Sequence, residues 1–136
     1  MTLDELHQQV WTALQSLEGD KLTAYDGDVP TTPATNYAVL WMNPGEARST
    51  RVGWKATIRA DQFWITVASG NSQRACLATA DLVRGRFTGL RLGDVEDPNA
   101  PRCKEQPGPG PFAPDQRIPG ETRWWMPMQY RLATSI

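Results

Sequence analysis

The sequence predicts an α+β fold, an antiparallel or mixed β-sheet with two main helices packed on one face. Three observations support this. An amphipathic helix pattern occupies the N-terminus, apolar stretches of strand length follow it, and a second helical stretch precedes a final segment with apolar residues at every second position. Helices arranged around paired strands in this way cover one face of the sheet. At this length we expect residues 1–136 to form a single domain.

The N-terminal segment carries the clearest helix pattern. Thr2 and Glu5 fit a capping box, in which two side chains satisfy free amides of the first turn. Apolar residues then recur at spacings of three and four, and Gly19 follows the last of them. The stripe consists of Leu3, Leu6, Val10, Leu14 and Leu17. These features predict a helix over residues 3–17.

Two extended segments follow this helix. "KLTAY" is predicted as a short strand that ends in a turn made by Asp26 and Gly27. "YAVLWM", residues 37–42, is apolar on both parities, which is typical of a strand covered on both faces. We therefore expect Trp41 in the core.

The middle of the chain is predicted to be a polar loop followed by extended structure. Residues 45–53 are polar and include Arg48 and Arg51, which indicates an exposed loop. In residues 54–69, apolar side chains alternate with Gln62, Trp64 and Thr66, so one face of this strand is expected in the core.

A second helix is predicted to begin near residue 70, with Asn71 or Ser72 as its cap. Its inward side consists of Cys76, Ala80, Val83 and Phe87. A brief strand is expected within "GLRLGDVED".

The C-terminal third combines a Pro-rich loop with a long strand. Residues 98–120 contain seven prolines and three glycines, so we expect a long loop with one short strand around residues 102–105. In "TRWWMPMQYRLATS" apolar residues alternate with Trp125, Pro127, Gln129 and Arg131. Pro127 cannot donate to a β-ladder, which predicts an edge strand or a bulge, with Trp125 and Arg131 on its outer face.

Composition excludes several classes of function. With 14 basic and 15 acidic residues the net charge is −1, which argues against a dedicated nucleic-acid-binding protein. Two cysteines without CxxC spacing and a single histidine are too few for a zinc site, and free thiols in a reducing cytoplasm are expected. No signal peptide or membrane-spanning segment is predicted, so no membrane partner is expected.

No residue pattern predicts catalysis, a metal or a cofactor. Asp26 and Asp28 resemble a calcium loop only superficially, since the position that needs a closing glutamate holds Tyr37. His7 lies beside the apolar stripe of the first helix, where a lone histidine is typically a packing or surface residue. Nucleophile elbows, phosphate-binding glycine loops and HExxH are absent from the sequence. We therefore expect a protein that is not an enzyme.

Six tryptophans are the strongest excess in the composition. Trp11 is expected to be half-buried, and Trp124 to lie in the core. We predict exposure for Trp54, Trp64 and Trp125, because each lies either at a strand position that alternates with the core-facing residues or at the margin of a loop. Exposed tryptophans mark subunit interfaces or ring-stacking ligand sites, and the missing export signal favours the interface.

Several stretches, taken in order, resemble a known family. They are "LTAYDGDVP", "NYAVLWMNPG", "SQRACLATADLVRGRFTG" and "RWWMPMQYRLAT". This order, with "YDG-x-VP" and "YAVL" as the most specific stretches, resembles the tail terminator (tail completion) proteins of long-tailed bacteriophages, especially phages of actinobacteria. The resemblance covers nearly the whole chain.

The resemblance implies a structural virion protein of the tail and neck, assembled in the host cytoplasm. Such proteins form a homohexameric ring that caps the tail tube and joins it to the head. The implied partners are other copies of the chain, the tail tube protein and a head–tail connector or stopper, with DNA passing through the lumen without specific binding. Candidate contact residues are Arg48, Arg51, Trp54, Trp64, Trp125, Gln129 and Arg131.

Two alternatives remain open from the sequence. The chain is also compatible with another head–tail connector of the neck, a stopper or adaptor. A different class is a small ligand-binding or carbohydrate-binding domain that stacks its ligand on Trp54, Trp64 or Trp125.

Overall fold

The computed structural model describes residues 3–19, 21–42, 46–48, 57–59, 62–93, 100–114, 117 and 121–133. These residues form two helices, α1 (Leu3–Gln15) and α2 (Gln73–Phe87), and seven strands. The strands are β1 (Thr23–Asp26), β2 (Asn36–Met42), β3 (Glu46–Arg48), β4 (Thr57–Arg59), β5 (Gln62–Ser69), β6 (Arg102–Gln106) and β7 (Trp124–Ala133). The predicted α+β class is confirmed.

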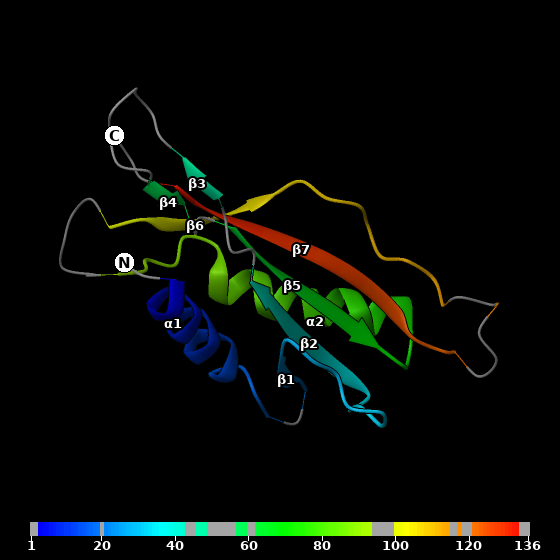
Figure 1. Cartoon of the computed structure of the whole chain (residues 1–136). Helices are drawn as coiled ribbons and strands as arrows, with labels where there is room; N and C mark the ends of the chain where they lie inside the picture. The colour runs from blue at the N-terminus through cyan, green and yellow to red at the C-terminus, as the bar shows by residue number, and fades with distance from the viewer. Residues whose placement is uncertain are drawn as a thin grey trace.

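Five of the strands form one mixed sheet in the order β1-β2-β5-β7-β6. The β1–β2 pair is parallel and the other pairs are antiparallel, while β3 and β4 pair separately as a two-stranded sheet. Both helices lie on the same face of the large sheet, α1 against β1 and β2 and α2 across the middle strands (Figure 1). The predicted packing of two helices on one face is therefore confirmed.

The core lies between the helices and the inner face of the sheet. It combines Leu6, Val10 and Leu14 of α1, Cys76, Ala80, Val83 and Phe87 of α2, and Ala38, Leu40, Phe63, Ile65, Val67, Met126, Met128 and Tyr130 of the strands. Phe63 stacks on Tyr130 with ring centroids 5.5 Å apart, and Phe87 is tilted against both rings. Full burial of side chains of this size contributes about 1.5–3 kcal/mol each, so this cluster fixes α2 on the sheet.

Local signals that the sequence predicted are present in the structure. Ser72 is the N-cap of α2, and its hydroxyl accepts a hydrogen bond of 3.1 Å from the amide of Ala75. Gly27 has a positive φ of 68° and donates its amide to the carbonyl of Leu40 at 2.9 Å. This hydrogen bond extends the parallel β1–β2 ladder by one residue, and residues 28–35 then lead the chain back to the start of β2.

The prediction that the last strand is an edge strand is wrong. β7 lies between β5 and β6, and Pro127 has Thr66 of β5 as its register partner. Backbone amides of a strand point alternately to its two sides. The amide of Trp125 donates to the carbonyl of Phe112 on the β6 side, so the backbone nitrogen of Pro127, two residues further on, faces the same side. β6 ends at Gln106, opposite Gln129, so no β6 carbonyl lies beside Pro127 that would need an amide donor.

Three other boundaries differ from the predictions. The predicted loop 45–53 contains β3, which pairs with β4. The predicted strand within residues 89–97 is reduced to a single bridge between Arg91 and Arg102 in its described part, and residues 94–97 lie outside the described residues. The first helix ends at Gln15, and Leu17 follows in a turn closed on the carbonyl of Leu14.

Candidate interaction surface

The face of the large sheet opposite the helices, called the open face below, is the candidate functional surface. Because Ala38 and Leu40 of β2 point into the core, Trp41 and the other alternate residues point away from the helices. Figure 1 shows both helices on the other side of the sheet. From the strands this face comprises Thr23, Tyr25, Tyr37, Val39, Trp41, Gln62, Trp64, Thr66, Ala68, Arg102, Lys104, Gln106, Trp125, Pro127, Gln129 and Arg131. Of these, Val39 and Ala68 are buried.

A row of large flat side chains crosses four strands of this face. Trp41 of β2 is the register partner of Trp64 of β5, which in turn faces Gln129 of β7, and Gln129 faces Gln106 of β6. Trp41 is 42% exposed. The amide nitrogen of the Gln129 side chain donates a 3.0 Å hydrogen bond to the side-chain oxygen of Gln62, which orients both amides on the surface.

A second aromatic pair lies at the other end of β7. Phe112 of the Pro-rich segment stacks on Trp125 with ring centroids 4.5 Å apart and ring planes at 23°. Two backbone hydrogen bonds, of 2.7 and 3.2 Å, join the same residues. Both rings remain largely exposed, at 39% and 42%. The Pro-rich segment therefore adds an aromatic ring to the open face.

The β1 end of the face holds two tyrosines. The rings of Tyr25 and Tyr37 lie 5.6 Å apart and are tilted at 60°, and the Tyr25 hydroxyl accepts a 3.0 Å hydrogen bond from the amide of Ala34. The guanidinium of Arg123 lies over the Tyr37 ring, 6.0 Å from its centroid. Burial raises the pKa of Tyr37, and Arg123 opposes the rise. These side chains are fixed by contacts within the chain.

The charges of the open face are all positive among the strand residues that the structure describes there. Arg102, Lys104 and Arg131 are exposed, and Lys104 and Arg131 are register partners next to the tryptophan row. The face thus combines an apolar aromatic centre with a cationic margin, the composition expected of an interface.

The predicted contact residues are only partly brought together. Trp125 and Arg131 are exposed on the open face as predicted, and Trp64 and Gln129 lie partly buried on it as register partners. Arg48 ends β3, opposite Thr57 of β4. Two further predicted residues, Arg51 and Trp54, lie outside the described residues.

The prediction that Trp41 lies in the core is wrong. Only one parity of "YAVLWM" faces the helices, and Trp41 shares the outward parity with Tyr37 and Val39. The half-buried position of Trp11 is confirmed, and Trp124 packs against the core while staying partly exposed. Sequence reasoning also missed Phe112, although a single aromatic residue in a Pro-rich segment is a signal for a docking contact.

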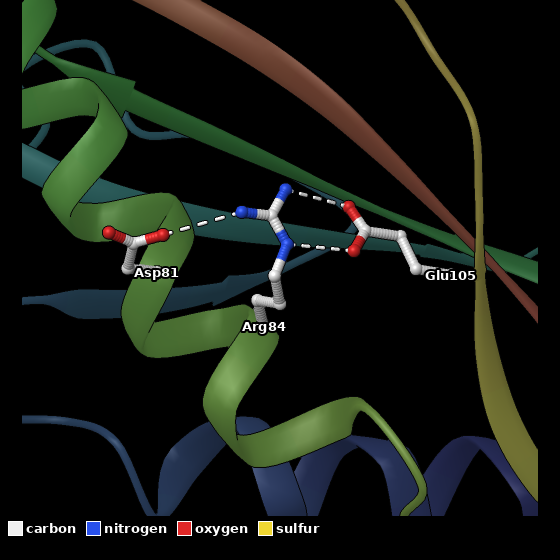
Figure 2. Close-up of polar contacts among 3 residues, drawn as sticks. All are labelled: Asp81, Arg84 and Glu105. Carbon is white, nitrogen blue, oxygen red and sulfur yellow. Dashed lines mark hydrogen bonds and ion pairs between the residues drawn. The ribbon is translucent and has the colours of Figure 1, made fainter.

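On the helix side, three charged residues link α2 to β6 (Figure 2). The guanidinium of Arg84 forms two hydrogen bonds with the carboxylate of Glu105, at 2.8 and 2.9 Å, and a longer contact of 3.3 Å with Asp81. The hydrogen bond to Glu105 is the main cause that raises the pKa of Arg84. The cluster is a structural link, since each charge has a partner of opposite sign.

Three further titratable groups lie outside the open face. His7 is hydrogen-bonded to Asp26 at 2.9 Å, which connects α1 to the end of β1. Cys76 and Cys103 are buried free thiols, and burial raises the pKa of both, that of Cys103 to about 12. No group of three potential metal ligands and no membrane-spanning helix occurs among the described residues.

Comparison with known proteins assigns no family to the chain. No protein-family model matches it, and no curated protein matches it significantly.

Proposed function

We propose that the chain is a tail terminator of a long-tailed bacteriophage, a structural virion protein that caps the tail tube as a homohexameric ring and joins it to the head or neck. The observation that carries the proposal is the open face. It holds Trp41, Phe112 and Trp125, three large apolar side chains that are each about two-fifths exposed. Several exposed aromatic side chains on one sheet face of a single chain are typical of a surface that another protein covers.

The partners proposed are other copies of the chain, the tail tube protein and a head–tail connector. A net charge of −1 suits a ring through which DNA passes without being held. Assembly would take place in the host cytoplasm, and the protein would remain in the virion at the tail–neck junction. Another neck component, a stopper or adaptor, would use the same surface in the same way.

The assembly state tests the proposal directly. We expect light scattering to show a hexamer, or a monomer that forms rings only when purified tail tubes are added. Trp41→Glu should abolish assembly, because it places a carboxylate at the centre of the contact. The matched control is Gln15→Glu on the exposed side of α1, which should assemble normally. A stable monomer that neither assembles nor docks on tubes would refute the proposal.

A phage that lacks the gene separates a terminator from other neck proteins. Loss of a terminator should give overlong tubes in electron micrographs, whereas loss of a stopper should leave tube length unchanged.

A carbohydrate-binding domain is the second candidate, and the row of Trp41, Trp64 and Gln129 favours it. Sugar rings stack on indoles and accept hydrogen bonds from amides, and this row offers both groups side by side. Titration with a panel of oligosaccharides, followed by tryptophan fluorescence, distinguishes the two functions. Saturable quenching that Trp41→Ala abolishes would favour the carbohydrate-binding domain.

A further inference from the structure

We propose that copies of this chain associate head to tail, with the open face of one copy seated on a groove on the helix side of the next. The groove lies between α2, the end of β6 and the following Pro-rich residues 107–111. The proposal deepens the function proposed above, and it rests on that function for the ring that the contact would build. The contact itself depends only on the two surfaces.

The groove is an apolar depression of about 500 Å³ at the β6 edge of the molecule. Its floor and walls include Met126 and Met128 of β7, Leu77 of α2 and Pro109. Arg84 and Glu105, which are hydrogen-bonded to each other, also line it. Flexible methionines and rigid prolines together form a surface that accepts a flat ring.

The exposed large apolar side chains of the described residues lie on just these two surfaces. Trp41, Phe112 and Trp125 stand on the open face, and Leu77, 42% exposed, lines the groove. One surface therefore presents protruding rings, and the other offers an apolar hollow. Each supplies what the other lacks.

Strand addition at the sheet edges does not offer an alternative route of assembly. At one edge, β1 has only four residues, and the amide of Ala24 donates to the carboxylate of Glu18 at 3.1 Å. At the other edge, the amide of Cys103 donates to the carbonyl of Leu90 at 2.8 Å, and prolines follow β6. Both edges are blunted, so a second copy is expected to bind through a face.

The charges of the two surfaces are complementary. The strand residues of the open face carry Arg102, Lys104 and Arg131 and, in their described part, no carboxylate. Beside the groove, Asp81, Arg84 and Glu105 form one ion-paired cluster of two carboxylates and one guanidinium, which leaves one net negative charge, and the side chain of Asp81 is 75% exposed. Two open faces packed on each other would instead bring these cations together.

Different surfaces in contact give a heterologous interface, which closes into a ring when the rotation between copies allows it. A two-fold dimer through the open face would cover Gln106 and Pro127, which the two surfaces share, but would leave Leu77 and Arg84 on the helix side of the groove uncovered. The head-to-tail contact covers both surfaces in every copy of a closed ring.

Cross-linking between single-cysteine variants tests the contact in the full chain. One variant is Gln129→Cys on the open face, and the other is Asp81→Cys, one turn from Leu77 on α2. Cys76 and Cys103 are 0% and 2% exposed, so they should not react with a short bismaleimide. A mixture of the two variants should cross-link into dimers, and each variant alone should give at least about tenfold less product.

Matched controls make the result specific. Gln15→Cys, on α1 at the opposite end of the helix layer, should cross-link with neither variant. Adding Leu77→Glu to the Asp81→Cys chain should lower the yield about tenfold, because an unpaired carboxylate in the groove costs more than 1.4 kcal/mol. A second pair, Thr66→Cys with Ala78→Cys, repeats the test should a variant fold poorly.

Three outcomes overturn the inference. They are dominant cross-linking of Gln129→Cys with itself, equal cross-linking by Gln15→Cys, and no cross-linking of either pair. A tail-tube docking assay distinguishes failure of this inference from failure of the proposed function. Protein that docks on tubes without the mixed cross-link refutes only the inference, whereas the mixed cross-link without docking refutes only the terminator function.

Discussion

Arg84 of α2 and Glu105 of β6 are joined by two charge-assisted hydrogen bonds, from Nε to Oε2 at 2.8 Å and from Nη2 to Oε1 at 2.9 Å. β6 is the outermost strand of the sheet, and it leads directly into the Pro-rich segment. The pair therefore connects the helix layer to this edge strand (Figure 2), and both residues line the groove.

Breaking this pair should lower the stability modestly. The two side chains are 44% and 26% exposed, so solvent screens the interaction, and we expect Arg84→Met or Glu105→Gln to cost about 0.5–1 kcal/mol. Urea denaturation of both single variants and the double variant measures the coupling. The control is Asp81→Asn, whose weaker 3.3 Å contact should contribute less. Strictly additive single variants would contradict the assigned link.

Two glycines should respond to alanine in opposite directions. Gly27 has a φ of 68°, and no atom lies within 4 Å of an added Cβ, so Gly27→Ala is costly only through its backbone, by about 1 kcal/mol. Gly85 is exposed within α2 and also has open space, so Gly85→Ala should stabilise by about 0.5–1 kcal/mol. Thermal unfolding of both variants checks the signs. A stabilising Gly27→Ala would show that the turn tolerates another conformation.

Removing the hydroxyl of Tyr130 should stabilise the protein. Tyr130 is fully buried, and its hydroxyl has no hydrogen-bond partner among the described residues. Tyr130→Phe keeps the stacking on Phe63 and removes the unsatisfied group, a gain of about 1 kcal/mol. The matched control is Tyr25→Phe, which loses the hydrogen bond from Ala34 and should cost about 1 kcal/mol. Urea midpoints that fall equally for both variants would contradict the assignment.

Much of this fold could be predicted from local patterns. Period-two alternation placed Phe63, Ile65 and Val67 inward, and the inward side of α2 followed from helical spacing. The Ser72 cap also needed only local sequence, because its partner amide is three residues away. These features depend on neighbours within the same element.

The wrong predictions concern pairings between distant segments. Pro127 argued for an edge or a bulge, but β6 joins β7 from a separate, Pro-rich part of the chain and leaves the ladder just before that residue. The sequence predicts Trp41 in the core because a continuous apolar run is the same pattern in a strand covered on both faces and in a strand with an aromatic open face. Only the arrangement of the two helices on one face distinguishes these cases.

Stability should fall in alkaline solution because buried acids stay protonated in the folded state. Burial raises the pKa of the Cys103 thiol from 9.0 to about 12, and it also raises the pKa of Tyr130. Above about pH 9 the unfolded chain therefore binds fewer protons than the folded chain, so its relative free energy drops as the pH rises. Stability is fully present below this pH and is lost progressively towards pH 12.

Urea denaturation at a series of pH values measures this loss. We expect constant stability just below pH 9.0, the thiol's unfolded value, and then a fall of at most about 1.4 kcal/mol per pH unit for each buried group. Cys103→Ala removes one titrating group, so its stability should start lower, because a side chain is truncated, but decline less steeply with pH. Tyr130→Phe should also flatten the decline, at pH values above 10.0, where an unperturbed tyrosine ionises. Slopes identical to those of the unmodified chain would show that neither group controls the alkaline transition.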